Sequence, residues 1–118
     1  MKIMIPTSVG ELIDKITILE IKSLFTDNVY VQKELEDLNK IKSTLTQYVL
    51  EDETKLKNVN QSLWNIEDKL RKKETLQEFD DEFIDLARSV YKLNDERAKI
   101  KKTINELYKS EFKEVKIY

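Results

Sequence analysis

The chain has 118 residues, and its 21 basic and 23 acidic side chains leave a formal net charge of −2. Because it contains no cysteine and no histidine, disulfides, thiol chemistry, Ser–His–Asp triads and the usual zinc sites are excluded, and we expect neither a metal nor a cofactor. The balanced charge provides no global basic field, so we expect no nucleic acid partner.

The length is that of one domain, which we place at residues 1–118. Charged residues interrupt every apolar stretch well before it reaches the ~20 residues of a membrane span. The N-terminal apolar stretch is not followed by the small-residue cleavage site of a signal peptide. We therefore expect a cytoplasmic protein without a membrane span. The only glycine, Gly10, and the only proline, Pro6, lie near the N-terminus, which favours long helices and short turns downstream.

Residues 8–25 are the most apolar stretch and predict the first helix. At about 100° per residue, apolar side chains cover most of its circumference, which is typical of a central helix covered by others. Ser8 and Glu11 match a capping box, so the helix is expected to begin there and to end near Thr26. Two carboxylates, Asp14 and Glu20, nevertheless fall within its apolar surface.

A second helix is expected from the turn at Asp27 and Asn28, either of which can cap it, to about Leu50. Its seam residues are spaced four and three apart in alternation and include a lysine: Val31, Leu35, Leu38, Lys42, Leu45 and Val49. The seam changes phase at residues 51–54, where a third helix is predicted to begin. The seam of this third helix is purely apolar: Leu56, Val59, Leu63, Ile66 and Leu70.

The last helix is expected to begin at a cap formed by Asp80 or Asp81, because residues 74–81 break the periodicity, and to end near Ser110. Its seam is the longest of the chain and carries an arginine: Phe83, Leu86, Val90, Leu93, Arg97, Ile100, Ile104 and Leu107.

These patterns together predict an all-α antiparallel bundle of three to four long helices, with the first helix inside. Residues 1–5 and 112–118 alternate in polarity, so short extended tails are also expected, with pairing of the two into a ribbon as an option.

Five charged residues fall at or beside apolar seams: Asp14, Glu20, Lys42, Arg97 and Lys101. A buried charge needs a partner, so these side chains should meet one another, a ligand or water. Long Lys and Arg side chains can also lie along apolar surface with their charges in water. A Glu20–Arg97 pair is the specific expectation, and it has two alternatives: a structural device that fixes helix register, or part of a binding site.

As a binding site, the polar residues would line a pocket between the first and last helices. Arginine in such a pocket binds carboxylate or phosphate groups, and a nearby carboxylate orients it or acts as an acid or base. The candidate ligand-binding residues are Asp14, Lys15, Glu20, Arg71, Arg88, Tyr91, Asn94, Arg97 and Lys101. Of these, Arg71, Arg88 and Tyr91 are expected at the mouth of the pocket, together with Trp64. No catalytic residue is assigned.

Three blocks carry a resemblance that covers nearly the whole chain: GELIDK at residues 10–15, WNIED at 64–68 and NDERA at 94–98. The chain resembles a family of short bacterial and phage proteins of unknown function. The resemblance implies a loose association with surface-polysaccharide and glycosyltransferase gene neighbourhoods. It also draws attention to the inward polar residues of the first and last helices.

A second resemblance, at the level of the fold, is to helical chorismate mutases, in which arginines, a lysine and a glutamate from different helices grip a dicarboxylate. Catalysis of that kind is positional and electrostatic and needs no histidine, cysteine or metal. The first helix here carries Lys15 and Lys22 but no arginine, which departs from that pattern.

Three functional hypotheses follow from the sequence. The leading one is a binding or accessory protein whose polar pocket recognises an anionic group on a small molecule or protein partner. The second is a metal-free enzyme on an anionic metabolite, with Arg97, Arg71 and Lys101 as anion clamps. In this hypothesis Glu20 or Asp14 is the acid, the base or the group that orients an arginine. The third is a structural helical oligomer, of which a homodimer is the simplest form, with its odd charges fixing register.

Overall fold

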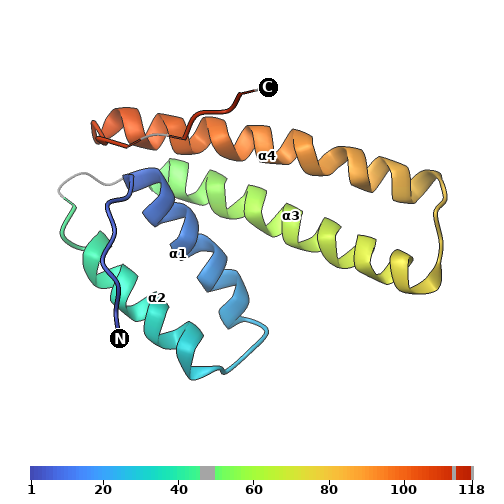
Figure 1. Cartoon of the computed structure of the whole chain (residues 1–118), viewed down its shortest axis with the longest axis horizontal. Coiled ribbons are helices and arrows are strands. Elements are labelled where there is room, and N and C mark those ends of the chain that lie inside the picture. Colours follow the sequence, from blue (N-terminus) through green and yellow to red (C-terminus); the bar gives the residue numbers. More distant parts are fainter. Residues whose placement is uncertain (46–49, 113, 118) are drawn as a thin grey trace.

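A computed structural model describes residues 1–45, 50–112 and 114–117 of the chain. The described residues form four helices, α1 (Val9–Ser23), α2 (Val29–Lys42), α3 (Leu50–Leu76) and α4 (Asp81–Leu107), and no strand. The all-α prediction is confirmed. The helices form two antiparallel hairpins, α1–α2 and α3–α4, with the first hairpin packed at an angle against one end of the longer second one (Figure 1).

Helix α1 is the centre of the molecule, because it packs against each of the other three helices. Eight of its residues are buried: Gly10, Leu12, Ile13, Asp14, Ile16, Thr17, Leu19 and Ile21. Ile13 joins Leu56 of α3 and Ile104 of α4 in the buried apolar cluster. The prediction of a central first helix is therefore confirmed.

The first cap is the predicted one, since the Ser8 hydroxyl accepts a hydrogen bond from the Glu11 backbone N–H at 3.1 Å. Helix α1 ends at Ser23, slightly before the expected Thr26. Asn28 caps α2 by accepting from the Tyr30 N–H.

The break between the second and third helices lies earlier in the chain than predicted. Helix α2 ends at Lys42 and residues 43–45 are not helical, whereas residues 51–54 belong to the first turns of α3. The seam residue Val49 lies outside the described residues. The acidic side chains Glu51, Asp52 and Glu53 suit a helix start, because carboxylates favour the positive end of the helix dipole.

Helices α3 and α4 extend beyond α1 as a two-helix arm, which we define as residues 64–76 and 81–93 (Figure 1). Asp80, one of the two predicted candidates, caps α4 by accepting from the Phe83 N–H at 2.9 Å. The Asp80 carboxylate also accepts from the ammonium of Lys73, at 3.0 and 3.1 Å, which links the two helices across their turn. Lys73 is buried, and Glu78 and Glu82 lie within 3.6 and 3.5 Å of it.

The two tails do not pair in the described residues, so the ribbon that the sequence allowed as an option is not formed there. The N-terminal segment runs along α2, where Lys2 forms an ion pair with Asp37 at 3.2 Å (Figure 1). The C-terminal segment instead turns back over α4, on the opposite side of the molecule. None of the described helices has the length and apolar character that crossing a membrane requires.

Candidate functional site

The Asp14 carboxylate and the Arg97 guanidinium form a two-point ion pair between α1 and α4. Arg97 Nε donates to Asp14 Oδ1 at 2.9 Å and Arg97 Nη2 donates to Oδ2 at 2.5 Å. The Asp14 side chain is 4% exposed and that of Arg97 is 27% exposed. The hydrogen bond to Asp14 is the main reason why the pKa of Arg97 is raised above its ordinary value.

Buried hydrogen bonds with Asn60 and Thr17 fix the position of Asp14. Asn60 of α3 donates through Nδ2 to Asp14 Oδ1 and to Thr17 Oγ1, both at 2.9 Å. The Thr17 hydroxyl in turn donates to the Asp14 backbone carbonyl at 2.7 Å. Because a buried polar network fixes its members when each is satisfied, Arg97 is anchored to a rigid point of the core.

Lys101 lies one turn beyond Arg97 on α4 and is held between two carboxylates. Its ammonium is 2.5 Å from Glu11 of α1 and 3.3 Å from Glu114 of the C-terminal segment. The Lys101 side chain is 8% exposed, whereas Glu11 and Glu114 are 45% and 44% exposed. The lysine therefore has a charge partner on a helix and a second one on the segment that follows α4.

The close approach of α1 to α4 depends on Gly10. The Gly10 N–H donates to the buried Asn105 Oδ1 at 2.7 Å, and the Val9 N–H donates to Ser110 Oγ at 3.1 Å. A Cβ atom on Gly10 would lie 2.8 Å from the Lys101 carbonyl oxygen. Side chains near the end of α4 thus satisfy backbone donors at the start of α1 that have no partner within the helix.

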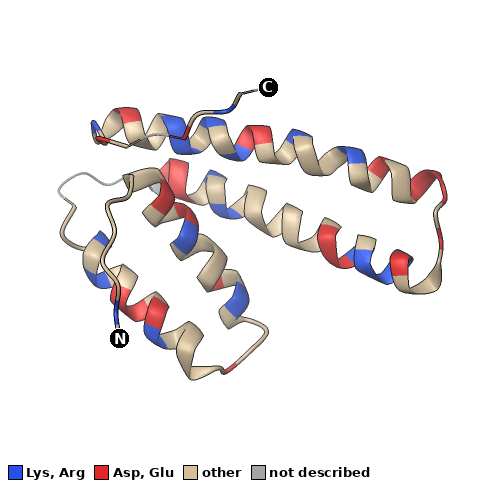
Figure 2. Ribbon diagram, in the orientation of Figure 1, with Lys and Arg blue, Asp and Glu red and all other residues tan. Residues whose placement is uncertain are grey.

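A pocket of about 240 Å³ opens beside these ion pairs. Helices α1 and α4 and the C-terminal segment line it with Glu11, Asn94, Arg97, Ala98, Lys101, Glu114 and Lys116. All of these side chains except Ala98 are polar, and three are cationic. In Figure 2 the C-terminal segment crosses α4 where basic residues of that helix gather.

Comparison with known proteins places the chain in a family. A family model matches residues 1–118, the whole chain. The chain belongs to DUF6165, a family of unknown function. No curated protein and no solved structure matches it, so the resemblance to helical chorismate mutases gains no support.

Of the candidate ligand-binding residues in this DUF6165 chain, the structure brings four together. Asn94, Arg97 and Lys101 line the pocket, and Asp14 lies behind Arg97. Lys15 instead forms an exposed ion pair with Glu34 of α2 at 2.8 Å.

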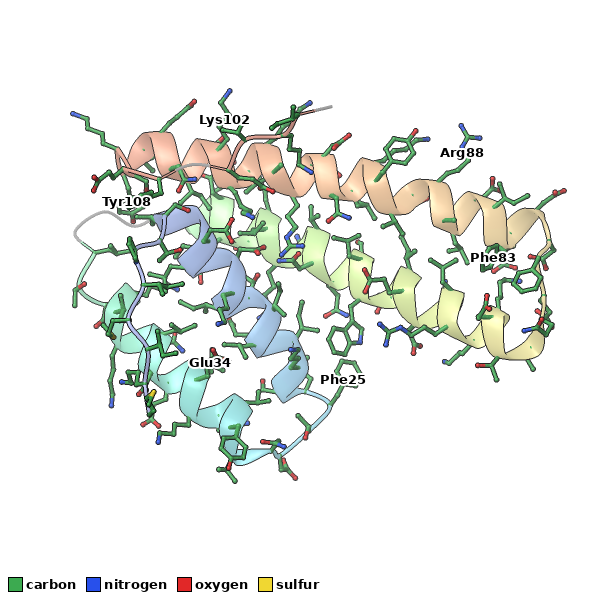
Figure 3. The ribbon with its side chains drawn as sticks, in the orientation of Figure 1. Phe25, Glu34, Phe83, Arg88, Lys102 and Tyr108 are labelled. Carbon is green, nitrogen blue, oxygen red and sulfur yellow. The ribbon has the colours of Figure 1, made fainter. Side chains whose placement is uncertain are left out.

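Arg71, Arg88 and Tyr91 are exposed and lie on the arm, outside the pocket. Arg88 points away from the rest of the molecule (Figure 3). Trp64 of α3 stacks on Phe25, which follows α1, with the two ring centres 5.2 Å apart. Trp64 is not among the residues that line the pocket.

The predicted Glu20–Arg97 pair is wrong. Glu20 contacts Lys57 of α3 at 3.0 Å, and Arg97 contacts Asp14. Glu20 lies six residues beyond Asp14, which is about 9 Å further along the helix axis. Helix α4 meets α1 at the N-terminal half of α1, through Gly10, Glu11 and Asp14, so Glu20 lies past the crossing.

Several residues of the pocket and its support were missed by sequence reasoning. Glu11 was assigned to the capping box, whereas its carboxylate contacts Lys101. A usable signal was present: Glu11 and Asp14 are spaced i,i+3 on one helix, and Arg97 and Lys101 are spaced i,i+4 on another, so two acids can face two bases. Asn60 flanks the apolar seam of α3, and Glu114 and Lys116 alternate with apolar residues in the C-terminal segment, but neither pattern indicates a pocket.

Proposed function

We propose that the pocket binds the anionic group of a small, polar molecule and that the protein acts as a binding or accessory module. The observation that carries the proposal is the convergence of Arg97, Lys101 and Lys116, with the Asn94 amide, on one pocket of about 240 Å³. This volume is below the ~300 Å³ at which typical ligand pockets begin, so a small polar group suits it better than a large apolar ligand.

The state of Arg97 supports this proposal. A guanidinium carries five N–H donors, and only Nε and Nη2 are used at Asp14. The remaining donors belong to a side chain that lines the pocket and is already held in place by the Asp14–Asn60 network. An anchored arginine loses little conformational freedom when it binds an anion, which favours affinity.

The enzyme alternative has less support from the geometry. Both oxygens of Asp14 face Arg97, which suits positioning of the arginine better than proton transfer. Glu20, the other candidate acid or base, is paired with Lys57 away from the pocket. We therefore propose binding and assign no reaction.

An anion titration at constant ionic strength tests the proposal. Acetate, citrate, sulfate and phosphate are each added in place of chloride while the melting temperature is recorded, because a ligand that binds the folded state alone raises it. We expect at least one anion to stabilise the wild type more than chloride does.

A matched pair of variants locates the binding. Lys116→Gln removes a cation that lines the pocket, and Lys102→Gln removes an exposed one that points away from α1 (Figure 3). The stabilisation is expected to fall in Lys116→Gln and to remain in Lys102→Gln. Equal behaviour of the two variants, or no anion effect on the wild type, contradicts the proposal.

A second candidate function, self-association, is favoured by the arm. No hydrophobic side chain from residue 64 to residue 93 is buried, and Leu76, Phe79, Ile84 and Tyr91 are more than half exposed. The solvent-accessible surface is 8684 Å², against roughly 6,700 Å² for a compact monomer of this mass. This excess is larger than the ~800 Å² that one partner buries in a standard interface.

The occupant that we propose for the arm is a second copy of the chain, which would complete a four-helix packing. Sedimentation equilibrium at micromolar concentration tests it, with a mass near twice 14.1 kDa as the expected result. Ile84→Glu is expected to give monomers, and Ile3→Glu, at an even more exposed apolar residue of the N-terminal segment, is expected to leave the dimer intact. A monomeric wild type contradicts this second candidate.

A further inference from the structure

The two carboxylates on Lys101 are held by the fold in different ways. Glu11 belongs to the first turn of α1, whose backbone is fixed against α4 by Asn105 and Ser110. Glu114 belongs to a segment with no regular structure, and its carboxylate is the more distant of the two, at 3.3 Å against 2.5 Å. Glu114 is therefore the partner that can leave with the smaller structural change.

The course of the chain after α4 brings Glu114 to this place. Lys109 has a positive φ of 53°, which reverses the direction of the backbone, and the Ser110 N–H donates to the Asn105 carbonyl at 2.8 Å. The segment then runs back along α4, so that Glu114 reaches Lys101 and Lys116 comes within 3.9 Å of Asp95 (Figure 1). A carboxylate from the end of the chain is thus delivered to a cationic pocket.

We infer that Glu114 occupies the place of a ligand carboxylate and competes with it. The inference rests on the proposed function and adds the chemical class of the ligand: a molecule with one carboxylate on a hydroxyl-rich body. When the ligand binds, its carboxylate replaces that of Glu114 beside Lys101, and only the Glu114 side chain leaves Lys101.

The charges around the pocket favour a monoanion. Three cations line it, and the structure pairs each of them with a carboxylate: Arg97 with Asp14, Lys101 with Glu11 and Glu114, and Lys116 with Asp95. A single ligand carboxylate that takes the place of Glu114 therefore leaves the local charge unchanged. A phosphate dianion would add a charge next to Glu11, where like charges repel.

The lining also favours a polar ligand body. Besides the charged groups, the pocket offers the Asn94 amide, and Ala98 is its one apolar side chain among the described residues. Hydroxyl groups can satisfy such donors and acceptors, whereas an aliphatic body would leave them without partners. D-glucuronate, which has one carboxylate and several hydroxyls, is therefore a suitable probe.

Calorimetric titration of three proteins with D-glucuronate tests the inference. Wild type is compared with Glu114→Gln, which removes the competing charge, and with Glu111→Gln, which removes an exposed charge from the same segment. A partly exposed ion pair is worth a factor of about two to five in an equilibrium constant. We expect Glu114→Gln to bind glucuronate about two- to fivefold more tightly than wild type, and Glu111→Gln to match wild type.

The outcomes separate this inference from the proposed function. If wild type binds glucuronate but Glu114→Gln binds it equally or more weakly, competition by Glu114 is refuted and anion binding stands. If inorganic phosphate binds more tightly than glucuronate, or if neutral glucose binds as tightly as glucuronate, the proposed ligand class is wrong. If none of these probes and none of the simple anions binds to any of the three proteins, the proposed function fails together with the inference.

Discussion

Asp14 and Arg97 are 83 residues apart in the sequence, and their side chains meet through two parallel hydrogen bonds in the folded protein. The pair joins the central helix α1 to the pocket on α4, with a buried carboxylate on one side and a partly exposed guanidinium on the other. It couples the stability of the fold to the geometry of the candidate site.

Replacement of Asp14 by Asn is expected to lower the free energy of unfolding by about 3 kcal/mol. Removal of one member of a buried ion pair leaves the other charge without compensation, and the partial exposure of Arg97 places the loss at the low end of the usual range. Urea unfolding measures it. Glu34→Gln, which breaks the exposed pair with Lys15, is the control and should cost less than about 1 kcal/mol. Equal losses in the two variants would contradict the assignment of Asp14–Arg97 as the anchored pair.

Gly10→Ala is expected to destabilise the protein by about 1–3 kcal/mol, because the new methyl group would meet the Lys101 carbonyl oxygen at 2.8 Å. The sign of this change in the free energy of unfolding is informative, because a Gly→Ala change at an unconstrained helix position stabilises a protein by up to ~1 kcal/mol. Ser62→Ala, at an exposed position of α3, is the matched control and should be neutral or slightly stabilising. Thermal or urea unfolding gives both values, and a more stable Gly10→Ala variant would refute the close helix contact.

Phe25→Ala is expected to change the fluorescence of Trp64, the only tryptophan of the chain, because the two rings are stacked. The accompanying loss of stability should be at most about 1 kcal/mol, since Phe25 is 64% exposed. Leu24→Ala removes a neighbouring apolar side chain that is 73% exposed and should leave the emission spectrum as in wild type. Identical spectra for all three proteins would argue against the stacked arrangement.

Asp80→Asn is expected to make the free energy of unfolding fall less steeply than in wild type as the pH is lowered. The pKa of Asp80 is lowered from its ordinary value of 3.8, first by the hydrogen bond from the Phe83 N–H and then by the one from Lys73. The unfolded state therefore binds the proton more readily, so the contribution of Asp80 is complete above pH 3.8 and is lost as the pH falls through its folded-state pKa.

The measurement is the urea midpoint of wild type and variant at several pH values. Wild type should exceed Asp80→Asn in stability at pH 7, and the difference should shrink on acidification below about pH 4. Asp81→Asn, at the next residue, removes a carboxylate that takes no part in either of these bonds and serves as the control. A difference that is independent of pH would show that the cap does not depend on the charge of Asp80.

Local signals predicted the helices well because each depends on neighbouring residues. The Ser8 and Asp80 caps are made by a side chain and a backbone N–H three residues later, so the sequence contains both partners. The break between α2 and α3 was placed too late, because a change in seam phase reports where a helix faces a new neighbour and not where the backbone leaves the helix.

The candidate site was predictable only in part. Asn94, Arg97 and Lys101 share one face of α4 through their spacing of three and four residues, and this spacing alone identifies that face. Their partners could not be predicted, because the offset between α1 and α4 is fixed by the Gly10–Asn105 contact, and a shift of one or two turns pairs Arg97 with a different acid. Periodicity favoured Glu20 as that acid, whereas Glu20 contacts Lys57 in the folded protein.

By itself the sequence determined the helical class, the central position of α1, two of the caps and the presence of charges on apolar faces. These properties follow from side-chain periodicity and short-range hydrogen bonds, which act over a few residues. Only the tertiary structure decided that Asp14 holds Arg97, that Asn60 holds Asp14, and that the C-terminal segment returns Glu114 to Lys101. Such contacts depend on crossing angles and chain reversals, which no local pattern encodes.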